Sequence, residues 1–303
     1  MINKPPIRVA IIGTGNIGTD LCFRMLHDSS FQVVALVGRR FDSPGINMFR
    51  GQVEHIITNG IEGLNPLLDE IDGAFDATSA FDHLNHWNVL SSVNKWVIDL
   101  TPSKIGLPLV PVLMNKVPSM RLLNEKSSNY SMVTCGGQSS APLLYGLTEA
   151  STGITGVEIS SSIAALSAGP ATRLNIDQYI ESTENLASIV SGCNNVKAIL
   201  VLNPADPPVM MRTTVNMAVR SCDISKAIKA TQTIVESVQS YVPGYELVVE
   251  PYMLNQTTVS ATVKVVGAGH VLPEYAGNLD IINAAAVETA KLHFSSVATG
   301  ESK

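Results

Sequence analysis

The sequence has little charge. Only 15% of its 303 residues are Asp, Glu, Lys or Arg, against about a quarter in an average soluble protein. The 20 basic and 26 acidic side chains leave a net charge of −6, so the chain lacks the positive excess that binds nucleic acids or anionic membranes. Hydrophobic residues reach 45%, which excludes a disordered chain. These proportions predict about two compact domains with surface buried between subunits of a homo-oligomer.

Cysteine and long apolar runs are also scarce. The four cysteines form no CxxC pair and have no zinc-ligand spacing with histidine, which argues against a disulfide framework and a metal site. No apolar run reaches the roughly 18 residues of a spanning helix, and the N-terminal apolar segment is too short for a signal peptide. We therefore expect a soluble, cytoplasmic protein without a metal.

The first part of the chain alternates strands and helices. Residues 7–12 are a continuous apolar strand, followed by a glycine-rich turn, a helical pattern and a second strand at 32–37. Further short strands lie within residues 73–80 and 95–102. Short strands that end in polar turns and alternate with helices are typical of a parallel sheet. The expected fold class is α/β, with a Rossmann dinucleotide-binding domain.

The periodicity changes after about residue 135. Residues 157–163 alternate as in a half-buried strand, and the helices are predicted at 177–190, 223–241 and 279–294, with further strands at 196–202, 246–249 and 257–266. We expect a dinucleotide-binding domain of residues 1–134 with 278–303, and an α+β catalytic and dimerisation domain of residues 135–277.

The first glycine turn has the spacing of a dinucleotide site. Gly13 permits a tight turn, Gly15 lets a pyrophosphate approach the backbone, and Gly18 lets the helix pack on the strand. The amide groups at the helix N-terminus then face the phosphates. An ordinary glycine turn without a ligand is the alternative.

Arginines follow the second strand, where an NAD enzyme usually carries an acidic residue. Arg39 and Arg40 stand there, and guanidinium groups suit a 2′-phosphate. The sequence therefore predicts that NADP is used or tolerated, with a solvated basic turn as the alternative.

Cys135 stands between a short apolar strand and the helical run 143–147, followed by Gly136 and Gly137. A helix N-terminus lowers a thiol pKa, and nearby amide groups stabilise an oxyanion. We therefore expect a nucleophile that attacks an aldehyde before hydride loss to a nicotinamide. A buried, inert cysteine is the alternative, and Cys22, on the apolar face of the first helix, is expected in the core.

Eight motifs, in order, cover nearly the whole chain: GTGNIGTDL, FDATSA, IDLTP, NYSMVTCGGQ, SAGPATRLNID, LNPADPPVMMR, YVPGY and HVLPEYAGNLD. Together they resemble the acylating, coenzyme A-dependent acetaldehyde dehydrogenases, which partner a 4-hydroxy-2-oxovalerate aldolase in aromatic catabolism. The resemblance implies a Rossmann domain, a semialdehyde-dehydrogenase-like α+β domain, NAD or NADP as cofactor, and a short aldehyde and coenzyme A as substrates.

The resemblance also implies the roles of particular residues. It places an acyl-thioester on Cys135. The cofactor contacts that it implies, with the glycine turn included, are Gly13, Thr14, Gly15, Asn16, Ile17, Ser167, Ala168, Gly169, Pro170, Asn175 and Asn278. Small residues and a proline at 167–170 form a loop that passes close to a planar ring, with a plain surface turn as the alternative.

The chain departs from the family pattern at several positions. Thr213 replaces an aspartate proposed as general base, Leu166 replaces a lysine, Arg40 replaces an acidic residue, and GGQSSAP replaces GGQATIP. A threonine is no base near neutral pH. Asp206 and Asp177 are alternative acids, each expected as a cap or loop carboxylate.

The remaining histidines and arginines leave other interpretations open. His83 and His86 share a helix and are expected on a solvated face, while His270 is expected either to line the site or to be structural. Arg173 and Arg212 would suit an acyl phosphate, so a related semialdehyde dehydrogenase acting on another acyl carrier or an acyl phosphate is one alternative. A cofactor-binding protein with impaired catalysis is another.

Overall fold

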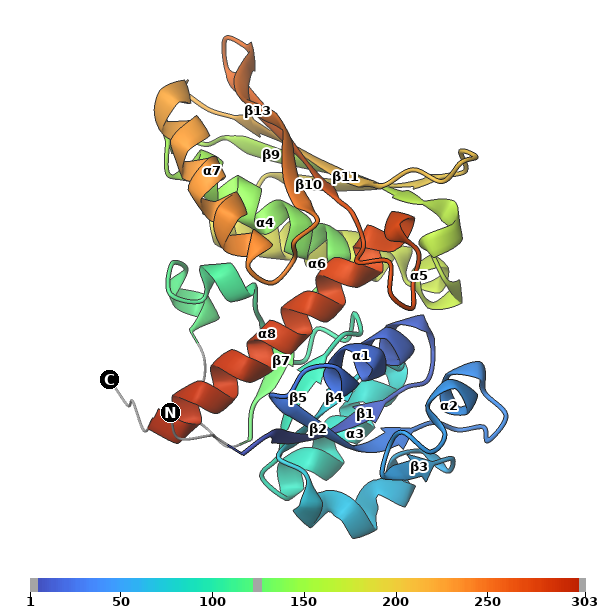
Figure 1. The fold of residues 1–303 in the computed structure, drawn as a ribbon. Helices are drawn as coiled ribbons and strands as arrows, with labels where there is room; N and C mark the ends of the chain where they lie inside the picture. Colours follow the sequence, from blue (N-terminus) through green and yellow to red (C-terminus); the bar gives the residue numbers. More distant parts are fainter. Residues whose placement is uncertain (1–4, 122–126, 300–303) are drawn as a thin grey trace. The chain divides into compact units, whose positions relative to one another are not determined.

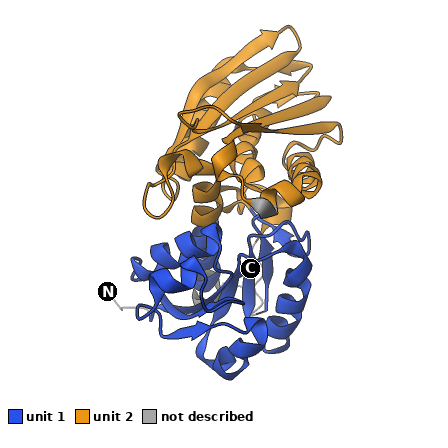
Figure 2. Ribbon diagram, turned by 90° about the vertical axis from the view of Figure 1, so that its right-hand side faces the viewer, with its two compact units in different colours: residues 1–109, 122–132, 286–303 blue, residues 110–121, 133–285 orange. Residues whose placement is uncertain are grey.

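The computed structural model describes residues 5–121 and 127–299, except for the side chains of residues 170–171 and 296–299. The chain divides into two compact units, shown in Figure 2: unit 1 comprises residues 1–109, 122–132 and 286–303, and unit 2 comprises residues 110–121 and 133–285. This division differs from the predicted one at three places. Residues 110–121 and 133–134 belong to unit 2, and the last helix is shared between the units instead of lying wholly in the first.

Unit 1 is built on a parallel sheet of seven strands in the order β3-β2-β1-β4-β5-β7-β6 (Figure 1). The strands are β1 (Ile7–Ile12), β2 (Phe31–Val37), β3 (His55–Ile57), β4 (Gly73–Asp76), β5 (Trp96–Asp99), β6 (Leu107–Pro108) and β7 (Asn129–Ser131). The centre of β1 is fully buried, as its continuous apolar run requires in a sheet covered by helices. The predicted α/β fold class is confirmed.

Helices connect the first five strands in sequence. They are α1 (Asn16–Leu26), α2 (Pro44–Phe49), the 3-10 helix η1 (Gly60–Glu70) and α3 (Ala80–Ser92). The last part of α8 (Gly277–Thr299) also belongs to unit 1. Ser79 begins α3 because its hydroxyl accepts a hydrogen bond from the Asp82 amide at 3.2 Å. His293 of α8 packs edge-on against Trp96 and Tyr130 of the sheet, and its Nδ1 lies 3.0 Å from the Tyr130 hydroxyl.

Unit 2 contains a mixed sheet of five strands in the order β10-β9-β11-β14-β13. The strands are β9 (Gly156–Ala164), β10 (Val196–Asn203), β11 (Met211–Ala218), β13 (Tyr245–Asn255) and β14 (Thr258–Val265), and a small pair is formed by β8 (Ser151–Thr152) and β12 (Ser221–Cys222). Three helices cover one face of the large sheet, namely α4 (Cys135–Thr148), α6 (Ile176–Ser191) and α7 (Ile224–Gln239) (Figure 1).

Alternation along β11 separates the two faces of that sheet. Met211, Thr213 and Val215 are fully buried, whereas Arg212, which lies between Met211 and Thr213, is exposed. Successive side chains on a strand point to opposite faces, so Arg212 points to the face opposite that of Thr213. The opposite face carries half-exposed apolar side chains, among them Ile199, Val201, Val249 and Tyr252.

The predicted strands and helices of unit 2 are present, and β13 extends to residue 255 instead of ending at 249. β11 is a strand that the sequence pattern did not predict. In the described part of the chain, no helix combines the length and apolar character needed to cross a bilayer.

Candidate functional site

Two glycines at the turn after β1 stand where a side chain has no room. Gly13 has φ +116°, and a Cβ there would lie 2.5 Å from the Ala77 carbonyl oxygen. A Cβ on Gly18 would lie 2.0 Å from the Gly13 carbonyl oxygen. A Cβ on Gly15, in contrast, would meet no atom within 4 Å. The first and third glycines therefore close the turn, and the second leaves open space beside the backbone.

This turn stands where a ligand binds in an open parallel sheet. Strand order reverses between β1 and β4, and a crevice forms there at the carboxyl ends of the strands. Gly15 is the N-cap of α1 and, like Asn16, is exposed, while Thr14 and Ile17 are half-buried. A helix N-terminus with open space beside Gly15 fits a pyrophosphate, so these residues suit a dinucleotide.

Arg39 and Arg40 are exposed after β2, and each is near a carboxylate. Arg39 Nη1 lies 3.6 Å from Asp82 Oδ2, and Arg40 Nε lies 3.2 Å from Asp42 Oδ1. Exposed ion pairs contribute little stability. Both guanidinium groups are therefore accessible to a phosphate at small energetic cost.

His83 and His86 are buried, so the expectation that they lie on a solvated face is wrong. Asp76, fully buried at the end of β4, accepts hydrogen bonds from His83 Nδ1 at 2.8 Å and His86 Nδ1 at 2.7 Å. These hydrogen bonds outweigh burial and lower the pKa of Asp76, while the partnership with Asp76 and Asp99 raises the pKa of His83. Burial raises the pKa of Asp99 to about 6. The cluster is an internal anchor that holds α3 on the sheet.

Cys135 is the first residue of α4, as predicted from the sequence. Thr134 caps the helix: its hydroxyl accepts from the Gly137 amide at 2.8 Å. The Cys135 side chain is partly exposed, in contrast to Cys22, which is fully buried as predicted, with a pKa raised by burial to about 12. Cys135 therefore lies at a helix N-terminus and, as a residue, is only partly exposed.

The expectation of a lowered thiol pKa is wrong for this structure. Burial raises the pKa of Cys135 to about 11, and the hydrogen bond with Tyr179 and the amides of Gly136 and Cys135 offset this only in part. Tyr179 of α6 places its hydroxyl 3.8 Å from Cys135 Sγ. Tyr179 was not among the site residues predicted from the sequence. The available signal was its place among inward-facing positions of α6, with Thr183, Leu186 and Val190 three to four residues apart.

Thr213, which stands at the position of the family aspartate, is fully buried in a group of hydroxyls. Its Oγ1 lies 2.8 Å from Ser139 Oγ and 3.1 Å from Ser161 Oγ. Ser139 also donates to the Gly136 carbonyl at 3.1 Å. The alternative acids Asp177 and Asp206 are exposed.

The loop of residues 165–175 is held by its own arginine. Arg173 donates to the carbonyls of Ala168, at 3.1 Å, and Ala165, at 2.9 Å. Of the predicted cofactor residues, Ser167 and Ala168 are buried, Gly169 and Asn175 are half-buried, and the side chain of Pro170 lies outside the described residues. Leu166 is 73% exposed. Arg173 therefore stabilises its own loop, and Arg212 points to the face of the sheet opposite that of Thr213. Both observations argue against an acyl-phosphate site formed by Arg173 and Arg212.

Asn278 is buried, and its Oδ1 has no hydrogen-bond partner among the described residues. A buried unsatisfied carbonyl costs about 1–3 kcal/mol, so this oxygen is suited to accept a hydrogen bond from a ligand such as a carboxamide. His270 is exposed.

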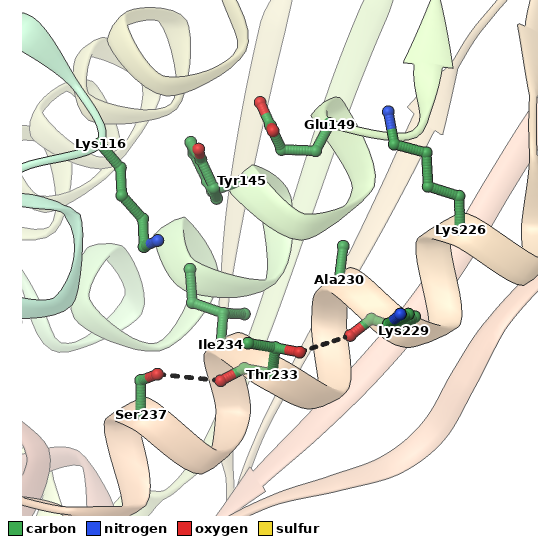
Figure 3. A pocket seen from close by; sticks show the side chains of 9 residues that line it. All are labelled: Lys116, Tyr145, Glu149, Lys226, Lys229, Ala230, Thr233, Ile234 and Ser237. Atoms are coloured by element: carbon green, nitrogen blue, oxygen red, sulfur yellow. Dashed lines mark hydrogen bonds between the residues drawn. The ribbon is translucent and has the colours of Figure 1, made fainter.

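A hollow on unit 2 lies elsewhere on α4. Figure 3 shows Lys116, Tyr145 and Glu149 facing the α7 side chains Lys226, Lys229, Ala230, Thr233, Ile234 and Ser237. Tyr145 is ten residues after Cys135 on the same helix, or about 15 Å along its axis. This hollow is therefore not the surroundings of the thiol.

One group of described residues has metal-ligand geometry, namely the exposed side chains Glu54, His55 and Glu70. Glu54 already accepts from Gln32, and Glu70 pairs with Arg8. An exposed acidic group with protein partners is no argument for a metal.

Comparisons with known proteins agree with this arrangement. Residues 135–273 match the model of the dimerisation region of prokaryotic acetaldehyde dehydrogenase. The acetaldehyde dehydrogenase of Spirochaeta aurantia is 46% identical over 94% of each chain, and that of Pectobacterium atrosepticum is 42% identical over 96% of each chain.

A solved structure shows the same fold. Aspartate semialdehyde dehydrogenase II of Vibrio cholerae, complexed with ASA, superposes with a TM-score of 0.63 at 14% identity, covering 96% of this chain and 99% of that one. Identity this low supports the fold alone, whereas the identities to the acetaldehyde dehydrogenases extend over nearly the full length. The chain belongs to the acetaldehyde dehydrogenase family and is an aldehyde dehydrogenase.

Proposed function

We propose that this protein oxidises a short-chain aldehyde to an acyl-CoA with NAD or NADP, or runs the reverse reduction, through a thioester on Cys135. The observation that carries the proposal is the partly exposed Cys135 at the N-terminus of α4, in a chain that also holds an open dinucleotide cradle after β1. The alternative, a dehydrogenase that acts on an acyl phosphate, has no such support, because Arg173 and Arg212 do not form a joint site for the phosphate.

Cys135 performs the covalent steps. Its thiolate sulfur attacks the aldehyde carbon, forming a carbon–sulfur bond and an alkoxide. When bound, the nicotinamide supplies a hydride acceptor, so the carbon is oxidised and a thioester remains on Cys135. The coenzyme A thiol, after losing its proton, attacks the thioester carbon, and the Cys135 thiolate leaves. Two carbon–sulfur bonds therefore form and the one to Cys135 breaks again, while the aldehyde carbon–hydrogen bond breaks as the hydride leaves.

The residues around Cys135 contribute hydrogen bonds. The amides of Cys135 and Gly136 lower the pKa of the Cys135 thiol, so they favour the thiolate that attacks and later leaves. The Gly137 amide is already used by Thr134, so it is not a free oxyanion donor.

For the cofactor, Gly15 would leave room for the pyrophosphate at the N-terminus of α1, in a turn closed by Gly13 and Gly18. Thr14, Asn16 and Ile17 line the same turn. Arg39 and Arg40 would bind a 2′-phosphate in place of their present carboxylate partners, Asp82 and Asp42. The Arg40→Ala substitution should then raise the KM for NADP about tenfold, the loss of one charge-assisted contact, and leave the KM for NAD unchanged. An equal effect on both cofactors would contradict this role.

The proposed assembly is a homo-oligomer. The matched dimerisation region and the half-exposed apolar side chains on the uncovered face of the unit 2 sheet support it. An aldolase-like partner and a place in aromatic catabolism stay predictions of the resemblance, and co-purification with a 4-hydroxy-2-oxovalerate aldolase would test them.

The decisive experiment measures nicotinamide reduction with acetaldehyde or propionaldehyde, with and without coenzyme A. Wild type is compared with Cys135→Ala and with the matched control Cys222→Ala, since Cys222 is also a free, partly exposed cysteine. We expect coenzyme A-dependent turnover that is lost in Cys135→Ala and kept in Cys222→Ala. Turnover that survives in Cys135→Ala would refute the proposal.

A further inference from the structure

Tyr179 is held against the reactive sulfur by the packing of α6 on α4. Its hydroxyl is 3.8 Å from Cys135 Sγ. Thr183 fixes the backbone of this turn, because its hydroxyl donates to the Tyr179 carbonyl at 2.8 Å and lies 2.7 Å from the hydroxyl of the α4 cap Thr134. A Cβ on Gly136 would lie 2.0 Å from the Tyr179 oxygen. The approach therefore depends on a glycine directly after the cysteine.

Behind Tyr179 the hydroxyls form a continuous chain. Tyr179 is hydrogen-bonded to Ser161, Ser161 is 3.1 Å from Thr213, and Thr213 is 2.8 Å from Ser139. The chain ends at the Gly136 carbonyl, 3.1 Å from Ser139. The three serine and threonine residues are at most 1% exposed.

The end of the chain fixes its direction in the resting protein. A carbonyl only accepts, so Ser139 donates to Gly136, Thr213 donates to Ser139, Ser161 donates to Thr213, and Tyr179 donates to Ser161. The Tyr179 oxygen is then left to accept the S–H of Cys135. This direction stabilises the neutral thiol.

When Cys135 is a thiolate, the hydrogen bonds of the chain must run in the opposite direction, because a sulfur without its proton can only accept a hydrogen bond. Each hydroxyl has one donor and two acceptor sites, so every member of the chain can rotate. Tyr179 then donates to sulfur, Ser161 to Tyr179, Thr213 to Ser161, and Ser139 to Thr213. The Gly136 carbonyl loses only the hydroxyl, because in a helix it also faces the amide four residues later.

We propose that Tyr179, backed by the reversible chain Ser161–Thr213–Ser139, is a catalytic residue that donates a hydrogen bond to the Cys135 thiolate during attack and during departure from the thioester. The chain contains no base, so the thiol proton leaves to solvent or substrate and the chain changes only its direction. Tyr179 remains protonated in this role because burial raises its pKa well above the usual value. This inference rests on the proposed role of Cys135.

Charged groups on the packed elements do not replace this contact. The hydroxyl chain is neutral throughout, and the pKa of Cys135 responds to burial, Tyr179 and backbone amides. The charged side chains of α6, α7, β11 and β14 are exposed or paired elsewhere: Asp177, Glu181, Lys226, Lys229, Glu236 and Arg212 are exposed, Glu184 pairs with Lys197, and Lys264 pairs with Glu246.

The test is the rate at which iodoacetamide alkylates Cys135 in the free protein as a function of pH, followed on the Cys135 peptide by mass spectrometry. In Tyr179→Phe the thiolate loses a donor but the ring remains. We expect the inflection to rise by about one pKa unit, and the rate below the inflection to fall about tenfold, as for loss of a hydrogen bond to a charged group. A residue that only accepts the S–H would give an unchanged or lowered inflection, which would overturn the proposal.

Two further variants make the result specific. Thr213→Val interrupts the hydroxyl chain without touching the sulfur, and it should shift the inflection in the same direction by a smaller amount. If Tyr179→Phe fails to fold, an unchanged inflection in Thr213→Val overturns the proposal. Tyr245→Phe is the matched control: this buried tyrosine donates to the Ser139 carbonyl of the same helix at 2.7 Å, and its loss should leave the inflection in place. Because no turnover is measured, the result is independent of the Cys135→Ala activity test.

Discussion

Gly18→Ala and Gly15→Ala, two substitutions at the glycine turn after β1, should have different effects: the first on stability and the second on cofactor binding. A Cβ on Gly18 would lie 2.0 Å from the Gly13 carbonyl oxygen, so the two groups must separate by more than an ångström. Overpacking of this kind costs about 1–3 kcal/mol. At about 2–4 °C per kcal/mol for a domain of this size, Gly18→Ala should lower Tm by several degrees.

Gly15→Ala should behave in the opposite way. Gly15 has φ −82° and ψ −171°, which alanine adopts freely, and its Cβ would meet no protein atom within 4 Å. Removing the flexibility of glycine stabilises a fold by about 0.4–1 kcal/mol at compatible positions. The new methyl group nonetheless occupies the open space beside Gly15, where the pyrophosphate is expected, so the Kd for NAD or NADP should rise at least about tenfold, which is about 1.4 kcal/mol.

The assay combines thermal melting with calorimetric titration of NAD and NADP for wild type and both variants. We expect unchanged or slightly higher Tm with weak binding for Gly15→Ala, and reduced Tm for Gly18→Ala. If Gly15→Ala binds the dinucleotide as tightly as wild type, the open space at Gly15 is not where the pyrophosphate approaches, and the cradle must be assigned elsewhere.

Three further predictions concern titration and burial. With a thiol pKa of about 11, alkylation of Cys135 in the free protein should rise about tenfold per pH unit between about pH 7 and 10, and a plateau near neutral pH would contradict it. Burial lowers the pKa of His293 to about 4. As pH falls, this histidine is therefore protonated at a higher pH in the unfolded chain than in the folded one, and the free energy of unfolding should fall by roughly 3 kcal/mol between about pH 6.5 and 4. Denaturant titrations should show this loss in wild type and a smaller one in His293→Phe. Asp76→Asn removes the carboxylate between His83 and His86 and should lower the free energy of unfolding by about 3 kcal/mol in the same denaturant assay. Asp82→Asn, on the helix α3 that carries both histidines, should change it by less than about 1 kcal/mol.

Local patterns predicted most of the unit 1 sheet and the position of the thiol. The buried run 7–12, the glycine spacing and the strand–helix alternation depend on neighbours close in sequence, and each corresponds to an element of the structure. Cys135 at the start of α4 followed from the same kind of argument, because a helix N-terminus is a local feature. The family resemblance added the expected chemistry, and the comparisons confirm the family.

Contacts between distant segments were not predictable from the sequence. Tyr179 and Ser161 reach the surroundings of Cys135 through the packing of α6 and the sheet on α4, and no local pattern encodes that packing. β11 was missed because a buried threonine, Thr213, interrupts its apolar alternation. His83 and His86 were assigned to solvent because burial of an imidazole depends on an acceptor, here Asp76, whose own burial is not visible in the pattern.

The division of the chain into interleaved segments has a consequence for the order of synthesis. Unit 1 consists of three separate segments and unit 2 of two. The ring of His293, near the end of the chain, packs against Trp96 and Tyr130 in the sheet that begins with β1. During translation the first strands therefore leave the ribosome long before the helix that completes their core, while unit 2 emerges almost whole in between. The unit that begins the chain is the one that finishes folding last.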